Sequence, residues 1–202
     1  MCVIYTALIV NMLVKITGET KARYHHSLYQ AALKGNWKEV DGIREKYPNA
    51  IREEITEASE TVFHIASATK HSDFIKKVVK LLTAEDLELR TKYGYTALSF
   101  VAESGIKSVA KEMVKKNVRL PLICDILGRT PIHIAVLQGR RDMVRYLFSV
   151  TPFLDLKAEE RREILVATVT NDMYGMPHMS IIVRLRQLIK SSITSFDVLI
   201  EI

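Results

Sequence analysis

The sequence predicts an all-α solenoid in which helix–turn–helix units stack side by side. The first observation is a short block of residues that recurs in steps of 35, 35 and 34 positions. Its copies begin at His26, Thr61, Thr96 and Thr130. A period of this size is typical of repeat proteins, in which each unit buries its apolar face only against its neighbours.

The second observation is that glycine recurs in register with this block. Nine positions after its start stand Gly35, Gly105 and Gly139. The second unit has Lys70 at this position. Glycine ends many helices in a left-handed conformation, so the inner helix of each unit is predicted to end here. Two positions before the threonine come Gly94 and Gly128, and with Asp125 they predict a tight turn.

The third observation is an apolar set that lies thirteen, fourteen and seventeen positions after the threonine in three units. The set comprises Phe74, Ile75 and Val78, then Val109, Ala110 and Met113, then Met143, Val144 and Leu147. A spacing of three to four residues predicts a second, amphipathic helix that faces the first. One unit is therefore a turn, a helix, a short reversal and a helix.

The segment Thr130-Pro131-Ile132-His133-Ile134-Ala135, followed by Gly139, resembles the ankyrin repeat, whose signature is T-P-L-H-x-A-A followed by G-H. The segment from Thr61 to Ala66 is the next best copy. The residues that carry this structural signature are Thr61, His64, Thr96, Gly105, Thr130, His133 and Gly139. The resemblance implies an ankyrin-repeat solenoid with short β-turn fingers between the helix pairs.

Three stretches resemble one subgroup of ankyrin proteins in particular, namely residues 27–37, 85–89 and 146–153. They are similar to the plant ankyrin proteins that usually continue into a second ankyrin block and a C-terminal multi-helix membrane domain of the PGG type. The resemblance covers roughly residues 24–175. It implies a role in plant signalling or in stress and defence responses, and it implies that the membrane domain of such relatives is absent from this chain.

These patterns divide the chain into an apolar lead, four repeats and a C-terminal region. The predicted segments are 1–22, then repeats at about 23–56, 57–91, 92–125 and 126–151, then 152–202. Residues 152–170 are expected to form a linker and the inner helix of a partial fifth repeat, with its outer helix at 179–189. The tail at 196–202 is apolar although a solenoid end should be polar. A truncated gene product or an alternative carboxyl terminus is therefore hypothesised.

The apolar lead from Cys2 to Val14 is shorter than the roughly 20 residues that a membrane-spanning helix needs. It also lacks the basic start of a secretory signal. We interpret it as a packing segment or as the product of a wrongly assigned start codon. A peripheral membrane or signal-anchor role is the alternative.

Composition limits the class of protein. The chain has 202 residues, of which 48% are hydrophobic and 26% charged, so it is expected to be ordered. A net charge of +6 favours acidic partners or anionic surfaces without choosing between them. Cys2 and Cys124 are too few for a disulfide framework or a zinc site. Reduced thiols predict a cytoplasmic protein, or one at the cytosolic face of a membrane if a longer form carries the membrane domain.

The sequence offers little catalytic chemistry. His64 and His133 each stand three residues after the repeat threonine, and we interpret them as structural groups that bond loop backbone and threonine hydroxyls. A catalytic base is the alternative interpretation. Cys124 and His133 have no third group to orient them, and His25 and His26 have no further ligands nearby in the sequence. No phosphate-binding glycine loop or paired acid motif is present. We therefore predict no enzyme activity, no catalytic residues, no cofactor and no metal.

Stacked repeats form a concave surface from turn tips and inner-helix faces. In the ankyrin family, partners usually contact the residues four, three and one before the threonine and seven and eight after it. In this chain these positions are Glu57, Ala58, Glu60, Ala68 and Thr69, then Lys92, Tyr93, Tyr95, Glu103 and Ser104, then Ile126, Leu127, Arg129, Leu137 and Gln138.

Two groups within this surface suggest a protein partner. Tyr93 and Tyr95 are candidate interface anchors. Ile126, Leu127 and Leu137 would form an apolar patch, which a monomer rarely exposes. The alternative is that some of these side chains pack against the next turn or against a missing continuation of the repeats.

A second candidate surface is a basic stripe on the convex face. Its residues are Lys76, Lys111 and Arg145, with Lys80 and Lys115 beside them. We interpret the stripe as an ordinary solvated outer face, since Asp73, Glu112 and Asp142 interrupt it. An anionic membrane surface is the alternative. Nucleic acid is the least favoured partner because no aromatic residues alternate with the charges.

The sequence therefore predicts a protein–protein interaction scaffold or adaptor. The alternative function is the soluble regulatory arm of a membrane-anchored ankyrin protein. Binding of lipid or nucleic acid through the basic face is the third hypothesis. The identity of the partner is not encoded in any motif of the chain.

Overall fold

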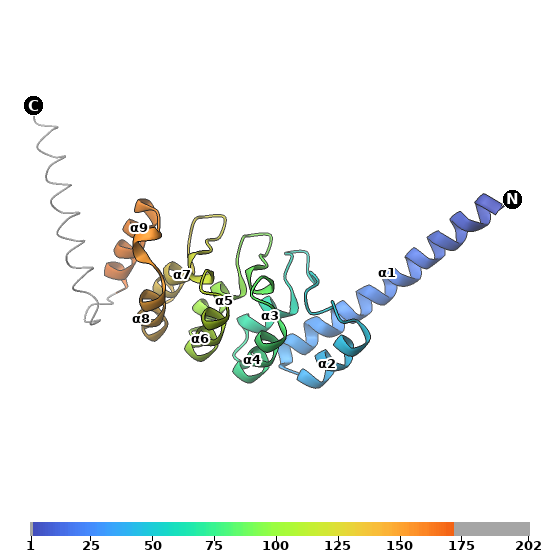
Figure 1. Cartoon of the computed structure of the whole chain (residues 1–202), viewed down its shortest axis with the longest axis horizontal. Helices are drawn as coiled ribbons and strands as arrows, with labels where there is room; N and C mark the ends of the chain where they lie inside the picture. Colours follow the sequence, from blue (N-terminus) through green and yellow to red (C-terminus); the bar gives the residue numbers. More distant parts are fainter. Residues whose placement is uncertain (1, 172–202) are drawn as a thin grey trace, which may run out of the picture.

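The computed structural model describes residues 2–171, and in the helix that begins at Cys2 it describes side chains from Gly18 onward. The predicted outer helix at 179–189 and the apolar tail at 196–202 lie outside the described residues. Between residues 2 and 171 the chain forms helices and connecting turns but no strand (Figure 1). The predicted all-α repeat fold is confirmed.

The described residues form α-helices and short 3-10 helices. The α-helices are α1 (Cys2–Lys34), α2 (Trp37–Lys46), α3 (Val62–Ala68), α4 (Ser72–Leu81), α5 (Ala97–Ser104), α6 (Lys107–Lys116), α7 (Pro131–Leu137), α8 (Arg141–Val150) and α9 (Ala158–Thr170). The short 3-10 helices are η1 (Asp86–Glu88), η2 (Leu120–Leu122) and η3 (Phe153–Asp155).

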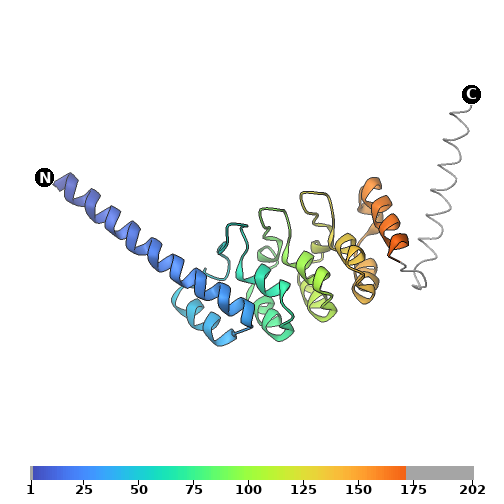
Figure 2. The same cartoon turned by 180° about the vertical axis from the view of Figure 1, so that it is seen from behind.

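The α-helices form two layers. The inner layer runs from α1 through α3, α5 and α7 to α9, and each of these helices packs against the next. The outer layer consists of α2, α4, α6 and α8, in which α6 contacts both α4 and α8. The loops that lead into α3, α5 and α7 project from one edge of the stack (Figures 1 and 2).

One continuous hydrophobic core lies between the two layers. The apolar set predicted for the outer helices is buried in full, from Phe74 to Leu147. From the inner helices, Leu98 and Ile132 have no exposed surface. Full burial of a side chain of this size stabilises a fold by roughly 1.5–3 kcal/mol, so the repeating apolar positions account for the stacking.

The inner helices end differently in different repeats. Gly35, Gly105 and Gly139 all have positive φ angles, between 65° and 80°. In the second repeat Lys70 does not adopt a left-handed conformation, and α3 ends at Ala68 with Thr69 in an extended conformation. The Thr69 hydroxyl donates a hydrogen bond to the Ala66 carbonyl. A side-chain oxygen therefore caps this helix where the glycine is missing.

Helix α1 is longer than an inner helix needs to be. It continues through the predicted boundary between residues 22 and 23, and its N-terminal half extends away from the stack (Figure 1). Lys21, Tyr24 and His25 all contact the Glu53 carboxylate, at 3.1, 3.0 and 2.9 Å. Burial acts to raise the pKa of Glu53, but these partners outweigh it and lower the pKa. The cluster fixes α1 to the loop after α2.

No helix in the described part of the chain combines the length and the apolar character needed to cross a lipid bilayer.

Candidate partner-binding surface

Three fingers project from the edge of the stack. We define the second finger as residues 55–60, the third as 90–95 and the fourth as 125–129. A backbone hydrogen bond of 2.8–3.0 Å closes each finger, because an amide near its start donates to the carbonyl of its last residue. The pairs are Ile55 and Glu60, Thr91 and Tyr95, and Asp125 and Arg129. Each finger leads directly into an inner helix.

A side-chain oxygen near the start of each finger accepts backbone N–H groups from within that finger. Thr56 Oγ1 accepts the amide of Glu60, and Thr91 Oγ1 accepts the amides of Tyr93 and Tyr95. Asp125 Oδ1 accepts two amides in the fourth finger, each at 2.9 Å. Asp125 is a predicted turn residue, whereas Thr56 and Thr91 were not predicted from the sequence. The sequence could have indicated them, because a residue whose side chain can accept a hydrogen bond stands five positions before each of Thr61, Thr96 and Thr130.

The turn of each finger contains one left-handed residue. Gly94 and Gly128 hold this position with φ angles of 79° and 77°. The second finger has Ser59 there with φ 58°, which is the one positive φ angle of a residue other than glycine in the described chain. A side chain in this conformation costs roughly 1–2 kcal/mol, so the second finger is locally strained.

Neighbouring fingers are joined backbone to backbone. The Lys92 amide donates to the Ala58 carbonyl at 2.8 Å, and the Ile126 amide donates to the Tyr93 carbonyl at 3.1 Å. In both pairs the donor lies four positions before its repeat threonine, and the acceptor lies three positions before the preceding one. We call this repeating set of hydrogen bonds the finger ladder.

Two predicted contact residues instead connect the third and fourth fingers. The Arg129 guanidinium pairs with Asp125 at 2.7 Å, donates to the Tyr95 hydroxyl and lies 5.8 Å from the centre of the Tyr95 ring. The Asp125 side chain is only 1% exposed. Burial acts to lower the pKa of Arg129, but Asp125 outweighs it and raises the pKa. Arg129 and Tyr95 are therefore half-buried structural residues as well as parts of the surface.

His64 joins the start of α3 to the segment that leads into the third finger. Its Nδ1 accepts the Thr61 amide at 3.1 Å and lies 3.0 Å from the Thr61 hydroxyl. Its Nε2 lies 3.0 Å from the Leu89 carbonyl, which requires that Nε2 carries the proton. Burial lowers the pKa of His64 to about 4, so the ring is neutral and structural.

His133 occupies the same position in the fourth repeat but has other surroundings. Its Nδ1 and the Thr130 hydroxyl are buried without a hydrogen-bond partner among the described residues. The nearest acid is Glu163 of α9, with an oxygen 3.9 Å from His133 Nδ1. Burial lowers the pKa of His133 as well.

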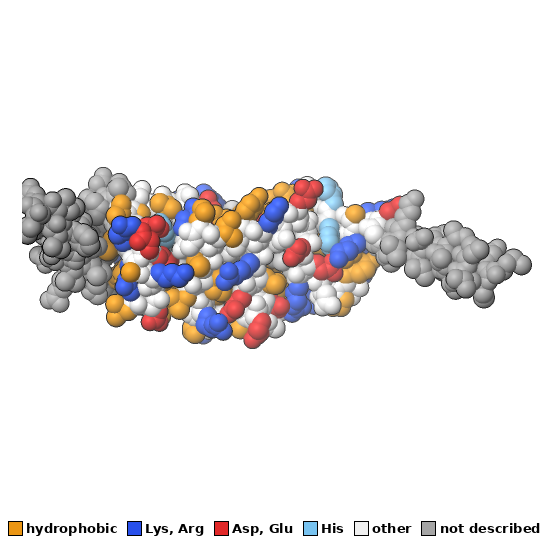
Figure 3. Space-filling view, turned by 90° about the horizontal axis from the view of Figure 1, so that it is seen from above, with side chains coloured by type: hydrophobic (Ala, Val, Ile, Leu, Met, Phe, Trp, Pro, Cys, Tyr) orange, Lys and Arg blue, Asp and Glu red, His pale blue; other side chains and the backbone are white. Residues whose placement is uncertain are grey.

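Of the remaining predicted contact residues, Ala58, Glu60, Thr69 and Ser104 are half-buried, and the others are exposed on the finger side. Lys92, Glu103 and Gln138 are exposed, as are Glu57 and Ala68. The exposed apolar residues are Tyr93 (50%), Ile126 (69%), Leu127 (67%) and Leu137 (44%). Figure 3 looks down on this face and shows hydrophobic side chains between charged ones. The ladder bond from Ile126 to Tyr93 brings the apolar residues of the two fingers together.

The predicted basic stripe lies on adjacent outer helices. Lys80, Lys111, Lys115 and Arg145 are exposed, whereas Lys76 is half-buried. Asp142 lies 3.3 Å from Arg145 and offsets part of its charge. A role for the stripe stays a prediction.

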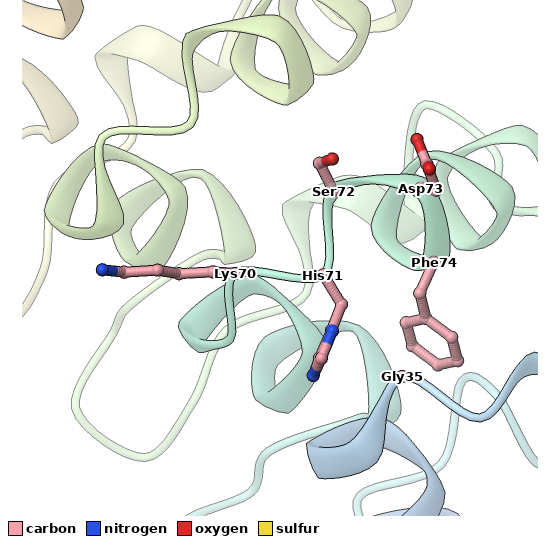
Figure 4. Close-up of a pocket in the computed structure, with 6 residues that line it drawn as sticks. All are labelled: Gly35, Lys70, His71, Ser72, Asp73 and Phe74. Atoms are coloured by element: carbon pink, nitrogen blue, oxygen red, sulfur yellow. The ribbon is translucent and has the colours of Figure 1, made fainter.

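Two open depressions lie away from the fingers. One has a volume of about 280 Å³ and is lined by Gly35 and residues 70–74 (Figure 4). There the Lys70 and Asp73 side chains point away from each other. The other has a volume of about 300 Å³ and lies between η1 and the end of α6. The described residues contain no group of three His, Cys, Asp or Glu side chains that could hold a metal ion.

Comparison with known proteins agrees with this geometry. The family model for ankyrin repeats (3 copies) matches residues 63–158. No curated protein sequence matches the chain. A chain in the crystal structure of the yeast ribosomal protein Rps3 in complex with its chaperone Yar1 is similar, with a TM-score of 0.56 and 20% identity. The match covers 63% of this chain and 92% of that one. Since 349 solved chains match, such likeness shows the fold and no particular partner.

Proposed function

Because this chain contains three ankyrin repeats, we propose that it is a protein-interaction scaffold or adaptor with no enzymatic activity of its own. Ankyrin repeats suggest a role in protein interaction, and the fingers with the inner helices form an extended surface for it. The partner-binding residues of this proposal are the exposed ones on the finger side.

One observation supports the proposal most directly. Tyr93, Ile126, Leu127 and Leu137 are each at least 44% exposed and come from two neighbouring repeats. Exposed aromatic and aliphatic residues that cluster in this way are typical of protein interfaces. Tyr93 is the best anchor among them, because no described hydrogen bond of its hydroxyl commits it to the fold.

The experiment is an affinity measurement with a partner found by proximity labelling of the intact protein. Tyr93→Ala and Leu137→Ala are each expected to weaken binding by about 1–2 kcal/mol. Val118→Ala is the matched control, since Val118 is 72% exposed but lies beyond α6, away from the fingers. Unchanged affinity of both surface variants for every partner would contradict the proposal.

We further propose that the scaffold acts in plant signalling or in stress and defence responses. Support comes from the resemblance of residues 27–37, 85–89 and 146–153 to the plant ankyrin proteins. The alternative is a regulatory arm of a membrane-anchored protein of the same kind. Full-length transcript sequencing distinguishes the two, since long apolar segments encoded after residue 170 would favour the regulatory arm.

An anionic membrane surface is the second partner that we propose, and the exposed lysines of α4 and α6 support it. Each basic residue near such a surface contributes about 1 kcal/mol. Sedimentation with acidic vesicles should then exceed sedimentation with neutral vesicles and should fall at high salt. Equal sedimentation with both would exclude this partner.

A further inference from the structure

The finger ladder ends at the fourth finger with an unused acceptor. The carbonyls of Ala58 and Tyr93 each accept an amide of the following finger. Leu127 holds the same position in the fourth finger, three residues before Thr130. Within residues 2–171, no hydrogen bond reaches the Leu127 carbonyl. An unpaired backbone edge of this kind is a template for pairing with another chain.

A fifth finger is missing because the sequence at its place favours a helix. One repeat beyond the fourth finger lie residues 159–163, and α9 already begins at Ala158. Arg162 stands where the third and fourth fingers have a left-handed glycine, and the surrounding residues are good helix formers. Helix α9 therefore replaces the finger, and no described backbone amide of residues 159–163 donates to the Leu127 carbonyl.

The apolar side chains beside the open carbonyl are uncovered. Ile126 and Leu127 are 69% and 67% exposed. A Cβ placed on Gly128 would meet no atom within 4 Å, whereas one on Gly94 would meet the backbone of the next finger at 2.9 Å. The space that a neighbouring finger fills beside Gly94 is thus open beside Gly128.

The base of the fourth finger also has polar groups without partners. The Thr130 hydroxyl, His133 Nδ1 and one Glu160 carboxylate oxygen are buried and make no hydrogen bond to any group of residues 2–171. In the second repeat the equivalent threonine and histidine are both bonded. Buried polar groups are rarely left unpaired, so their number here suggests a missing donor.

The charge beside these groups is negative. Glu163, Glu160 and Asp125 all lie close enough to act on the charge of His133, and the one opposing cation, Arg129, is paired with Asp125 in the described chain. The neighbouring arginines are engaged elsewhere, since Arg161 donates to carbonyls of the preceding loop and Arg162 pairs with Glu159. Glu163 is half exposed, which leaves a carboxylate available to a basic group.

Resting on the protein-interaction function proposed above, we propose that the open edge of the fourth finger binds an extended segment of a partner protein. A backbone N–H of that segment donates to the Leu127 carbonyl, as Lys92 and Ile126 donate within the ladder. An apolar side chain of the segment packs on Ile126 and Leu127, and a basic side chain reaches Glu160 and Glu163. Extended segments commonly bind exposed backbone edges in this manner.

The test uses the full chain and a phage-displayed library of random peptides of about twelve residues, long enough for one extended binding segment. Selected peptides are expected to combine apolar residues with Arg or Lys. Leu127→Asp should weaken their binding by at least about tenfold. Val118→Asp, which adds the same charge at an equally exposed site away from the fingers, should leave the affinity unchanged.

Two further measurements address the backbone and the charge. Methylation of a single amide nitrogen in the peptide should lower affinity by about tenfold at one position and not at its neighbours. Glu163→Gln should weaken binding and reduce its dependence on salt, because one ionic contact is lost.

Several results would overturn the inference. They are failure to select any peptide, binding that survives Leu127→Asp, and insensitivity to amide methylation at every position. A dimer that Leu127→Asp dissociates would assign the edge to a second copy. Shifts of the amide resonances of residues 172–202 in Leu127→Asp would assign it to this chain's own C-terminal segment. If Tyr93→Ala weakens a protein partner while Leu127→Asp does not, only this inference fails, and the proposed function stands.

Discussion

Gly94 lies directly against the backbone of Ile126, so that a Cβ on Gly94 would be 2.9 Å from the Ile126 nitrogen. Gly128 has nearly the same φ angle, but no atom of the described chain lies within 4 Å of the equivalent point. A substitution at Gly128 therefore measures only the cost of a side chain in the left-handed conformation. The same substitution at Gly94 adds the cost of a clash between the third and fourth fingers.

The first prediction compares alanine at these two positions. Gly128→Ala should lower the free energy of unfolding by about 1 kcal/mol, because alanine is strained at positive φ. Gly94→Ala should lower it by about 1–3 kcal/mol more, since it also forces the third and fourth fingers apart. Urea unfolding followed by circular dichroism measures both. Equal losses would show that the fingers do not need this close backbone contact.

The second prediction concerns the strained residue of the second finger. Ser59→Gly should raise the free energy of unfolding by about 0.5–1 kcal/mol, because relief of the left-handed side chain exceeds the added entropy of the unfolded chain. Ser59→Val should lower it by about 1 kcal/mol or more, since a branched Cβ fits this conformation worst. Thermal unfolding of the three proteins provides the order of stability. A glycine variant no more stable than the parent would mean that the finger bears no strain at Ser59.

The repeat pattern was sufficient to predict the helices because burial imposes it. Positions such as Ile75, Met113 and Leu147 recur with the period and are all buried, so the stacking of two helical layers could be read from their spacing alone. The start of α1 was different. An apolar segment such as residues 2–14 has no polar face to mark where a helix begins, and the continuity of α1 could not be read from it.

The surface was harder to predict than the core. The contact positions implied by the resemblance lie on the fingers and at the ends of the inner helices, but the sequence gave Arg129 and Tyr93 equal weight. Only coordinates show that Arg129 is paired with a buried acid and that Tyr93 is half exposed. The open carbonyl of Leu127 is a backbone property with no side-chain signature. It follows from the absence of a fifth finger, which the helix-forming residues 159–163 could have indicated.

The third prediction is that Arg129 supports the fold. Arg129→Ala should lower the free energy of unfolding by about 2–4 kcal/mol, because it leaves the Asp125 carboxylate buried without its cation. Asp125→Asn combined with Arg129→Ala should recover part of this loss, since the amide carries no charge but still accepts the finger amides. Chemical unfolding of the single and double variants measures the coupling. Strictly additive losses would show that the ion pair contributes nothing.

The fourth prediction is a loss of stability in mild acid that originates at His64. Its pKa is about 4 in the folded protein and about 6.5 in an unfolded chain. Above pH 6.5 the ring is neutral in both states and its contribution to stability is complete. As the pH falls from 6.5 to 4, the unfolded state binds a proton that the folded state excludes, and up to about 3 kcal/mol is lost.

His64→Ser is the matched variant for this prediction, because the third repeat has Ser99 at the equivalent position, within 3.5 Å of the Thr96 hydroxyl. The variant should be less stable at pH 7 but should lose less stability between pH 6.5 and 4.5. Unfolding in urea at a series of pH values measures the slope for both proteins. The lowered pKa of His133 adds a smaller slope of the same sign that both proteins share. Identical slopes would place the acid-sensitive group elsewhere, whereas a shallower slope in His64→Ser assigns it to the hydrogen bonds that join Thr61, His64 and Leu89.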